Sequence, residues 1–142
     1  MTNEYPDRPR LAVGGVVIRG DKVLLVRRGR EPARGEWAIP GGSVEIGETL
    51  GEAVERELRE ETGIQAQAGD ICHLFEAIRK DETGRVRFHY VIVDLLAEYV
   101  SGAPCAADDA REAAWLSADD LPGRPVNRST LELLKKLGFL KS

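Results

Sequence analysis

The stretch that decides the fold is PGGSVEIGETLGEAVERELREETGI, which occupies residues 40–64. Two glycines and an acidic loop come first, and apolar residues with a helical period follow from Leu50 onward. Thr49 and Glu52 form the T-x-x-E pattern of a capping box, and Gly63 stands where a helix commonly ends. The stretch therefore predicts a loop followed by a helix that is capped at both ends.

Three glutamates of this helix, Glu57, Glu60 and Glu61, fall within an arc of ~100°. Like charges one turn apart repel each other, and acidic residues in the last turn oppose the helix dipole. Arg56 and Arg59 offset only part of this cost. Mg²⁺ prefers oxygen ligands and commonly binds beside substrate phosphates, so the cluster indicates a metal site. The alternative is a solvated acidic helix face.

The loop before the helix carries further groups of the same kind. Glu45 and Glu48 add negative charge. Gly41 and Gly42 have no side chains, so the backbone can approach an ion closely and a carbonyl can serve as a ligand.

The spacing of these residues is G-x5-E-x7-R-E-U-x-E-E-x-G-U, where U is apolar. It is met by Gly42, Glu48, Arg56, Glu57, Leu58, Glu60, Glu61, Gly63 and Ile64. This pattern is the Nudix box, and from about residue 8 to 137 the chain resembles Nudix hydrolases. The resemblance implies an α/β fold, a Nudix-type α/β/α sandwich with a central mixed sheet. We expect a single domain over residues 1–142, with an ordered core at about 8–137.

The resemblance also implies a reaction, the Mg²⁺- or Mn²⁺-dependent hydrolysis of a diphosphate linkage in a nucleoside diphosphate joined to another group. The implied metal ligands are the Gly41 carbonyl, Glu57, Glu60 and Glu61, while Glu48 and Arg56 position the cluster. Which carboxylate acts as the base stays open, as does the number of metal ions.

Some relatives carry an extra acidic ligand in the loop before a late tryptophan. Here Asp109 stands six residues before Trp115, and we expect it to be the extra ligand or base. Glu112 is the second choice. The alternative is that both are solvated loop acids.

The strands around the box resemble the ADP-ribose pyrophosphatase-like branch, which implies cleavage of ADP-ribose to AMP and ribose 5-phosphate. One departure is the absence of a proline at residues 78–81, where many ADP-ribose hydrolases carry one. A tyrosine typical of dinucleoside polyphosphate hydrolases is also missing there. Two alternatives stay open: a house-cleaning hydrolase of oxidised or non-standard nucleoside triphosphates, and a non-catalytic nucleotide-binding regulatory module.

Arginines and ring residues outside the box are candidate substrate contacts. Arg28 and Arg30 would bind phosphates, and Trp37 or Phe75 would stack on a base. His89 and Tyr90, on the long strand, are further candidate contacts. The alternative is ordinary, because arginines at strand ends are usually solvated and aromatic residues on strands usually belong to the core.

The remaining pattern predicts strands and one further helix. Expected strands cover residues 11–18, 22–26, 86–99 and 113–116, with a hairpin joining the first two. Asn127 can cap a final helix that ends before Gly138, with Leu131, Leu134 and Leu137 facing inward.

Composition limits the class of protein. The net charge is -4, with 42% hydrophobic and 31% charged residues, which is typical of soluble globular proteins. A basic face for nucleic acid is missing, and no apolar run approaches the ~18–20 residues that span a bilayer. The first ten residues lack an apolar leader, and Cys72 and Cys105 form no metal or redox pair. We expect a cytoplasmic protein with a small-molecule nucleotide substrate, and a homodimer is possible.

Overall fold

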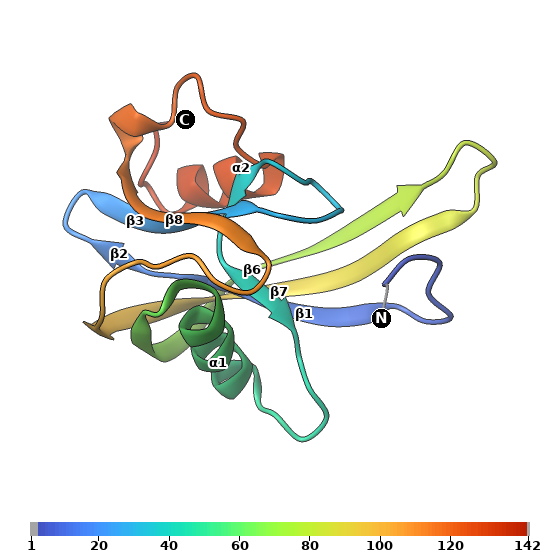
Figure 1. Cartoon of the computed structure of the whole chain (residues 1–142), viewed down its shortest axis with the longest axis horizontal. Coiled ribbons are helices and arrows are strands. Elements are labelled where there is room, and N and C mark those ends of the chain that lie inside the picture. The colour runs from blue at the N-terminus through green and yellow to red at the C-terminus, as the bar shows by residue number, and fades with distance from the viewer. Residues whose placement is uncertain (1–2, 142) are drawn as a thin grey trace.

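The computed structural model describes residues 3–141 and contains a mixed β-sheet at its centre. The strand order is β5 (Gly41–Ser43), β1 (Arg10–Val16), β7 (Val86–Ser101), β6 (Gln65–Lys80). β1 runs parallel to β7, whereas the β1–β5 and β6–β7 pairs are antiparallel. Figure 1 shows the β6–β7 hairpin extending well beyond the rest of the molecule.

A second, antiparallel sheet lies beside the mixed one. It contains β2 (Ile18–Arg19), β3 (Lys22–Arg28), β4 (Trp37–Ala38) and β8 (Ala110–Ser117), with β3 pairing all three others. The chain passes from the mixed sheet to this one at Val17, between β1 and β2. Residues 11–18, predicted as one strand of a hairpin, are therefore divided between two sheets, and only β2 pairs with β3.

Helix α1 (Leu50–Thr62) has the caps that the sequence predicts. Both hydrogen bonds of the capping box between Thr49 and Glu52 are formed, and Gly63 has a left-handed φ of 72°. Val54 and Leu58 are buried in a core that also contains Val93, Leu95 and Ala97 of β7. This apolar stripe fixes α1 on one face of the mixed sheet, so its acidic side faces the loop that precedes it.

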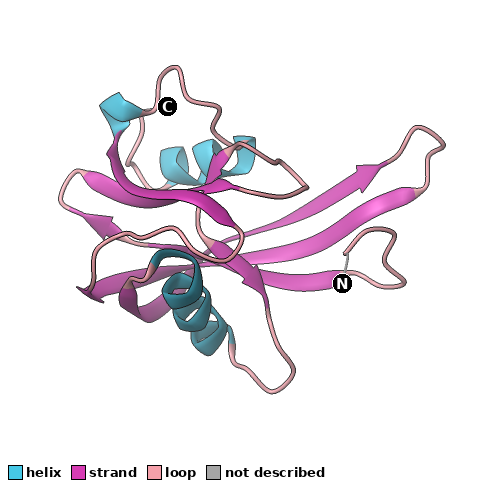
Figure 2. Cartoon of the chain, viewed as in Figure 1, coloured by secondary structure: helices cyan, strands magenta, loops and turns pink. Residues whose placement is uncertain are grey.

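Helix α2 (Arg128–Lys136) lies on the opposite side of the molecule, after the 3₁₀ turn η1 (Ala118–Asp120). Asn127 caps α2, because its side-chain oxygen accepts the Ser129 backbone N–H. Leu134 is buried and Leu137 packs against the same core, as predicted. Leu131 is only half-buried, and Leu133 is the second buried leucine of the helix. The helices and sheets in Figure 2 confirm the α/β prediction.

Alternation along β7 gives its two faces different roles. Val93, Leu95 and Ala97 point toward α1 and belong to the core. Tyr90, Ile92 and Asp94, which alternate with them, lie on the other face, where they share a cleft with residues of α2. Among residues 3–141, no helix is long and apolar enough to cross a membrane.

Candidate active site

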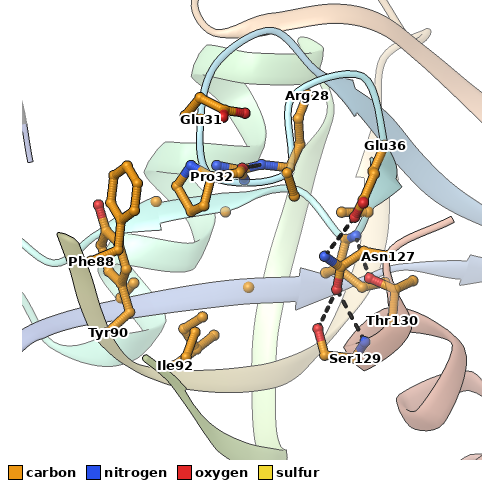
Figure 3. A pocket seen from close by; sticks show the side chains of 18 of the residues that line it. Arg28, Glu31, Pro32, Glu36, Phe88, Tyr90, Ile92, Asn127, Ser129 and Thr130 are labelled. Carbon is orange, nitrogen blue, oxygen red and sulfur yellow. Dashed lines mark hydrogen bonds between the residues drawn. The ribbon is translucent and has the colours of Figure 1, made fainter. Parts of the chain in front are cut away.

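A cleft of about 1100 Å³ opens on the face of β1 and β7 that is turned away from α1. One of its sides is the β7 wall, which we define as Phe88, Tyr90, Ile92 and Asp94. The segment between β3 and β4 and the first turn of α2 form the other side. Figure 3 shows the ring residues of β7 across the cleft from Arg28 and Pro32.

The acidic end, defined as Glu48, Glu57, Glu60 and Glu61 of the box, lies where α1 meets the two glycines of β5; of these four, Glu57 and Glu61 line the cleft. The Gly41 backbone N–H donates to Glu61 Oε1 at 3.0 Å. A Cβ on Gly42 would lie 2.5 Å from the Glu57 carboxyl carbon. A side chain at Gly42 would displace the Glu57 carboxylate from this place.

Arg56 is the hub of this acidic end. Its guanidinium donates to Glu48 Oε2 at 2.6 Å, to Glu57 Oε1 at 2.8 Å and to Glu60 Oε2 at 3.3 Å. It also donates to the Ser43 carbonyl at 2.9 Å. One cation therefore fixes the orientation of three carboxylates and ties them to the end of β5.

The carboxylates differ in pKa because they differ in burial and in the hydrogen bonds they accept. Burial raises the pKa of Glu61 to about 8; the Gly41 N–H opposes this shift, and the charge of Glu57 adds to it. Burial also raises the pKa of Glu57, against the opposing effect of Arg56. In contrast, the hydrogen bond from Arg56 lowers the pKa of Glu48 to about 2. Negative charge on Glu57 and Glu61 is thus disfavoured, because the described residues compensate it only in part.

This donor set fits a hard divalent cation in its chemistry. The groups are oxygen donors only, and the buried Glu61 has a raised pKa that an adjacent cation would lower. Within residues 3–141, no three carboxylate, imidazole or thiol groups converge into a ready-made metal cage. Glu57 and Glu60 contact Arg56 instead. The metal-ligand roles of Glu57, Glu60, Glu61 and the Gly41 carbonyl accordingly stay predictions.

The loop before β8 brings further acids to the site. Asp109 and its neighbour Asp108 both line the cleft, and the charge of Asp109 helps to raise the pKa of Glu61. The Asp109 carboxylate accepts from Arg30 at 2.6 Å, and its carbonyl accepts the Gly29 N–H at 2.8 Å. Asp109 thus lies beside the acidic end, as expected for an extra ligand, but it is paired with a cation.

Glu112, the second choice for that role, lies farther along β8. Its carboxylate accepts from Arg27 at 3.2 Å, and it is not among the residues that line the cleft. This placement favours Asp109 over Glu112.

Four of the six candidate substrate contacts lie on the cleft: Arg28, Arg30, Phe75 and Tyr90. Arg28 donates from Nε to the Pro32 carbonyl at 2.8 Å, and its charge lies close enough to lower the pKa of Glu61.

Trp37 and His89 do not line the cleft. Trp37 is 4% exposed and packs in the second hydrophobic core, beneath Arg124. His89 lies one position out of phase with the β7 wall and faces the other side of the sheet. These placements argue against a direct contact between either ring and a substrate in the cleft.

Sequence interpretation missed three cleft residues that alternation could have revealed. Phe88, Ile92 and Asp94 share a face with Tyr90 because they are spaced by two along β7. An aspartate inside the apolar run VIVDLL is itself a signal, since a buried carboxylate is rare unless it is paired or functional.

Comparisons with known proteins agree with this geometry. A model of the NUDIX domain matches residues 8–134. An ADP-ribose pyrophosphatase of Methanocaldococcus jannaschii is 35% identical over 114 residues, which cover 80% of this chain and 65% of that protein. The chain therefore spans slightly less than two thirds of that relative.

A second relative and one solved structure are similar over more of their own length. A putative 8-oxo-dGTP diphosphatase 2 of Mycobacterium tuberculosis is 33% identical over 116 residues, 79% of this chain and 76% of that protein. A MutT NUDIX hydrolase from Burkholderia pseudomallei has a TM-score of 0.79 at 30% identity, with 92% of this chain and 99% of that chain covered. Sequence, fold and family model coincide, and the chain belongs to the NUDIX family.

Proposed function

We propose that this chain hydrolyses the diphosphate linkage of nucleoside diphosphate derivatives with the help of a divalent cation, and that ADP-ribose is its first candidate substrate. The observation that carries the proposal is a pair of carboxylates, the half-buried Glu57 and the buried Glu61, held against Gly42 and Gly41 at one end of a cleft. A relative named ADP-ribose pyrophosphatase, at 35% identity, supports the choice of substrate.

The acidic end would hold the cation. Glu57, Glu60, Glu61 and the Gly41 carbonyl are the proposed ligands, with Asp109 as a further one. A bound Mg²⁺ or Mn²⁺ would offset the negative charge that develops on the diphosphate during hydrolysis.

The other residues of the site orient the carboxylates or would attract the substrate. Arg56 holds Glu48, Glu57 and Glu60 in place through four charge-assisted hydrogen bonds, two of them to Glu48. Arg28 places positive charge beside Glu61, where a substrate phosphate would arrive. The ring residues of the β7 wall offer an apolar face to a nucleoside.

A substrate panel tests the proposal. The purified chain is incubated with ADP-ribose and other nucleoside diphosphate derivatives in Mg²⁺, in Mn²⁺ and in EDTA, beside Glu60→Gln and Glu61→Gln. We expect AMP and ribose 5-phosphate from ADP-ribose only with a cation present, and little product from either variant. The proposal fails if no diphosphate compound is cleaved or if both variants keep full activity.

A house-cleaning hydrolase of oxidised nucleoside triphosphates is the second candidate function, favoured by the relative named putative 8-oxo-dGTP diphosphatase 2 at 33% identity. Adding 8-oxo-dGTP to the panel separates the two, because its products would be the nucleoside monophosphate and pyrophosphate. A non-catalytic nucleotide-binding module would bind these compounds and release no product.

We further propose that the chain works in the cytoplasm on small nucleotides and without nucleic acid. Its two cysteines, Cys72 and Cys105, are free thiols, which fits a reducing compartment. A homodimer stays a prediction.

A further inference from the structure

Asp94 on the β7 wall is a carboxylate that the proposed chemistry leaves without a role. It is 4% exposed and lies on the cleft. Its oxygen occupies the space above Gly14, where an added Cβ would approach Oδ1 to 2.2 Å. The absence of a side chain at Gly14 therefore makes the room that Asp94 occupies.

The Asp94 carboxylate has no partner within residues 3–141. No hydrogen bond or ion pair of its side chain is found there; only its backbone carbonyl accepts, from the Cys72 thiol at 3.5 Å. Burial alone raises the pKa of Asp94 to about 6. Because a buried, unpartnered carboxylate is costly, its presence indicates that something else satisfies it.

The carboxylate is reachable from the cleft. In the described part of the chain, one polar side-chain atom, Arg10 Nε, is both sealed from solvent and without a hydrogen-bond partner. The Asp94 oxygens are therefore not sealed. They offer two acceptors at the base of the cleft to any ligand that carries paired O–H or N–H donors.

The place of Asp94 in the sheet suggests which donors these are. Gly41, Gly14 and Asp94 are register neighbours on β5, β1 and β7, so Asp94 lies roughly 10 Å from Gly41, two strand spacings away. Tyr90 lies four residues before Asp94 on β7, roughly 13 Å from it. The order acidic end, Asp94, ring residues matches the order diphosphate, ribose, base in a nucleotide.

We propose that Asp94 binds the 2′- and 3′-hydroxyls of the ribose between the diphosphate and the base. Two adjacent hydroxyls supply two donors, which a carboxylate can accept together. The inference rests on the proposed function and deepens it, because it makes the cleft selective for ribonucleoside over 2′-deoxynucleoside compounds.

The test compares ADP-ribose with its analogue that lacks the 2′-hydroxyl on the adenosine ribose, and GTP with dGTP. For the wild type we expect kcat/KM to favour the ribose form by about tenfold or more, the size of one hydrogen bond to a charged group. Asp94→Asn should reduce this ratio to about threefold or less while keeping or raising the thermal midpoint, because a buried charge is removed.

Glu98→Gln is the matched control, since Glu98 lies exposed on the same strand outside the cleft. It should keep the wild-type ratio. Where a pair is not cleaved, the same ratio is taken from dissociation constants measured by calorimetry.

The inference is overturned if the wild type does not distinguish the two sugars, or if Asp94→Asn keeps the wild-type ratio in a folded protein. If the wild type hydrolyses both sugar forms equally well, the proposed function stands and only the ribose site is ruled out. Failure of hydrolysis with a preserved binding ratio removes the proposed function and keeps the ribose site.

Discussion

The acidic end and the β7 wall differ in how their side chains are held. At the acidic end, Arg56 bonds three of the four carboxylates and the Gly41 N–H bonds the fourth. Along the β7 wall, no side chain makes a hydrogen bond or ion pair with any of residues 3–141. The carboxylates of the acidic end are held by hydrogen bonds within the protein, whereas the polar side chains of the β7 wall are free to bond a ligand.

This difference separates two properties of the protein. Braced carboxylates are suited to a step in which charge develops, because they need no reorganisation at that moment. An open wall is suited to choosing among ligands, since its side chains gain their partners only on binding. We therefore expect damage to the acidic end to lower kcat and damage to the wall to raise KM.

The largest effect is expected for Glu61→Gln and Glu57→Gln. Each should lower kcat by about 100- to 1000-fold, the range seen when one preorganised electrostatic group is lost from an active site. KM should change little. Steady-state kinetics on the preferred substrate measures both, with Glu98→Gln as a control that keeps full activity. A variant with a raised KM and an unchanged kcat would contradict the assignment of the rate to the acidic end.

Arg56→Ala should be the most destabilising change at the site. It leaves Glu48 and Glu57, whose side chains are 17% and 13% exposed, without their cation. Breaking such a pair costs about 2–4 kcal/mol of unfolding free energy. Denaturant unfolding measures this, beside Arg59→Ala, an exposed arginine of the same helix that should stay within about 0.5 kcal/mol. Equal losses from both arginines would show that Arg56 is not the hub.

Without divalent cations, stability should fall as pH rises from about 4.5 to 8. The pKa of Glu61 is raised to about 8 from 4.5, so the folded state binds more protons than the unfolded state across this window, and the protection is lost as Glu61 ionises. Each pH unit is worth about 1.4 kcal/mol at most. Thermal unfolding in EDTA measures the slope.

Glu61→Gln is the control for this slope, because glutamine does not titrate. The variant should have a flatter pH dependence between pH 5 and 8, and the slope that remains is due to Asp94, below about pH 6, and to Glu57. A slope that is unchanged in the variant would mean that Glu61 is ionised in the folded protein throughout.

Tyr90→Ala should raise KM about 5- to 100-fold and leave kcat within about threefold, as expected for the loss of one aromatic contact to a base. His89→Ala is the matched control. His89 is its neighbour on the same strand but faces the other side of the sheet, so KM should stay unchanged. If His89→Ala raises KM as much as Tyr90→Ala, the cleft is not the binding surface.

The smallest effect is expected for Asp109→Asn. The Asp109 side chain is 45% exposed and already paired with Arg30, so its help to a cation should be worth about fivefold in apparent Mg²⁺ affinity. Titration of activity with Mg²⁺ measures it. Glu112→Gln should leave the Mg²⁺ dependence unchanged; the reverse ranking would make Glu112 the additional acid.

The two regions also differ in how far the sequence predicts them. All residues of the acidic end come from one contiguous stretch of sequence. The helix cap at Thr49 and the spacing of Glu57 and Glu61 by one turn fix the positions of these carboxylates on α1 locally. The structure confirms that helix and both of its caps. The division of residues 11–18 between two sheets could not be foreseen, because strand pairing depends on partners far away in the chain.

The part of the cleft beyond the box also depends on contacts between segments that are far apart in the sequence. It joins β1, β7, the segment after β3 and the start of α2, so the sequence identified Tyr90 and Phe75 only as two candidates among several rings. Trp37 was a candidate of the same kind and lies in the core. Alternation along β7 selects Asp94 and excludes His89, but only once the face that α1 covers is known.

The most direct test of the division is a double-mutant cycle of Glu61→Gln and Tyr90→Ala on kcat/KM. If the acidic end sets the rate and the β7 wall sets the choice of ligand, the two losses should multiply in the double variant to within about twofold. The single variants should separate, one in kcat and the other in KM. A double variant no worse than Glu61→Gln alone, or a Tyr90→Ala variant that has lost kcat, would contradict the account.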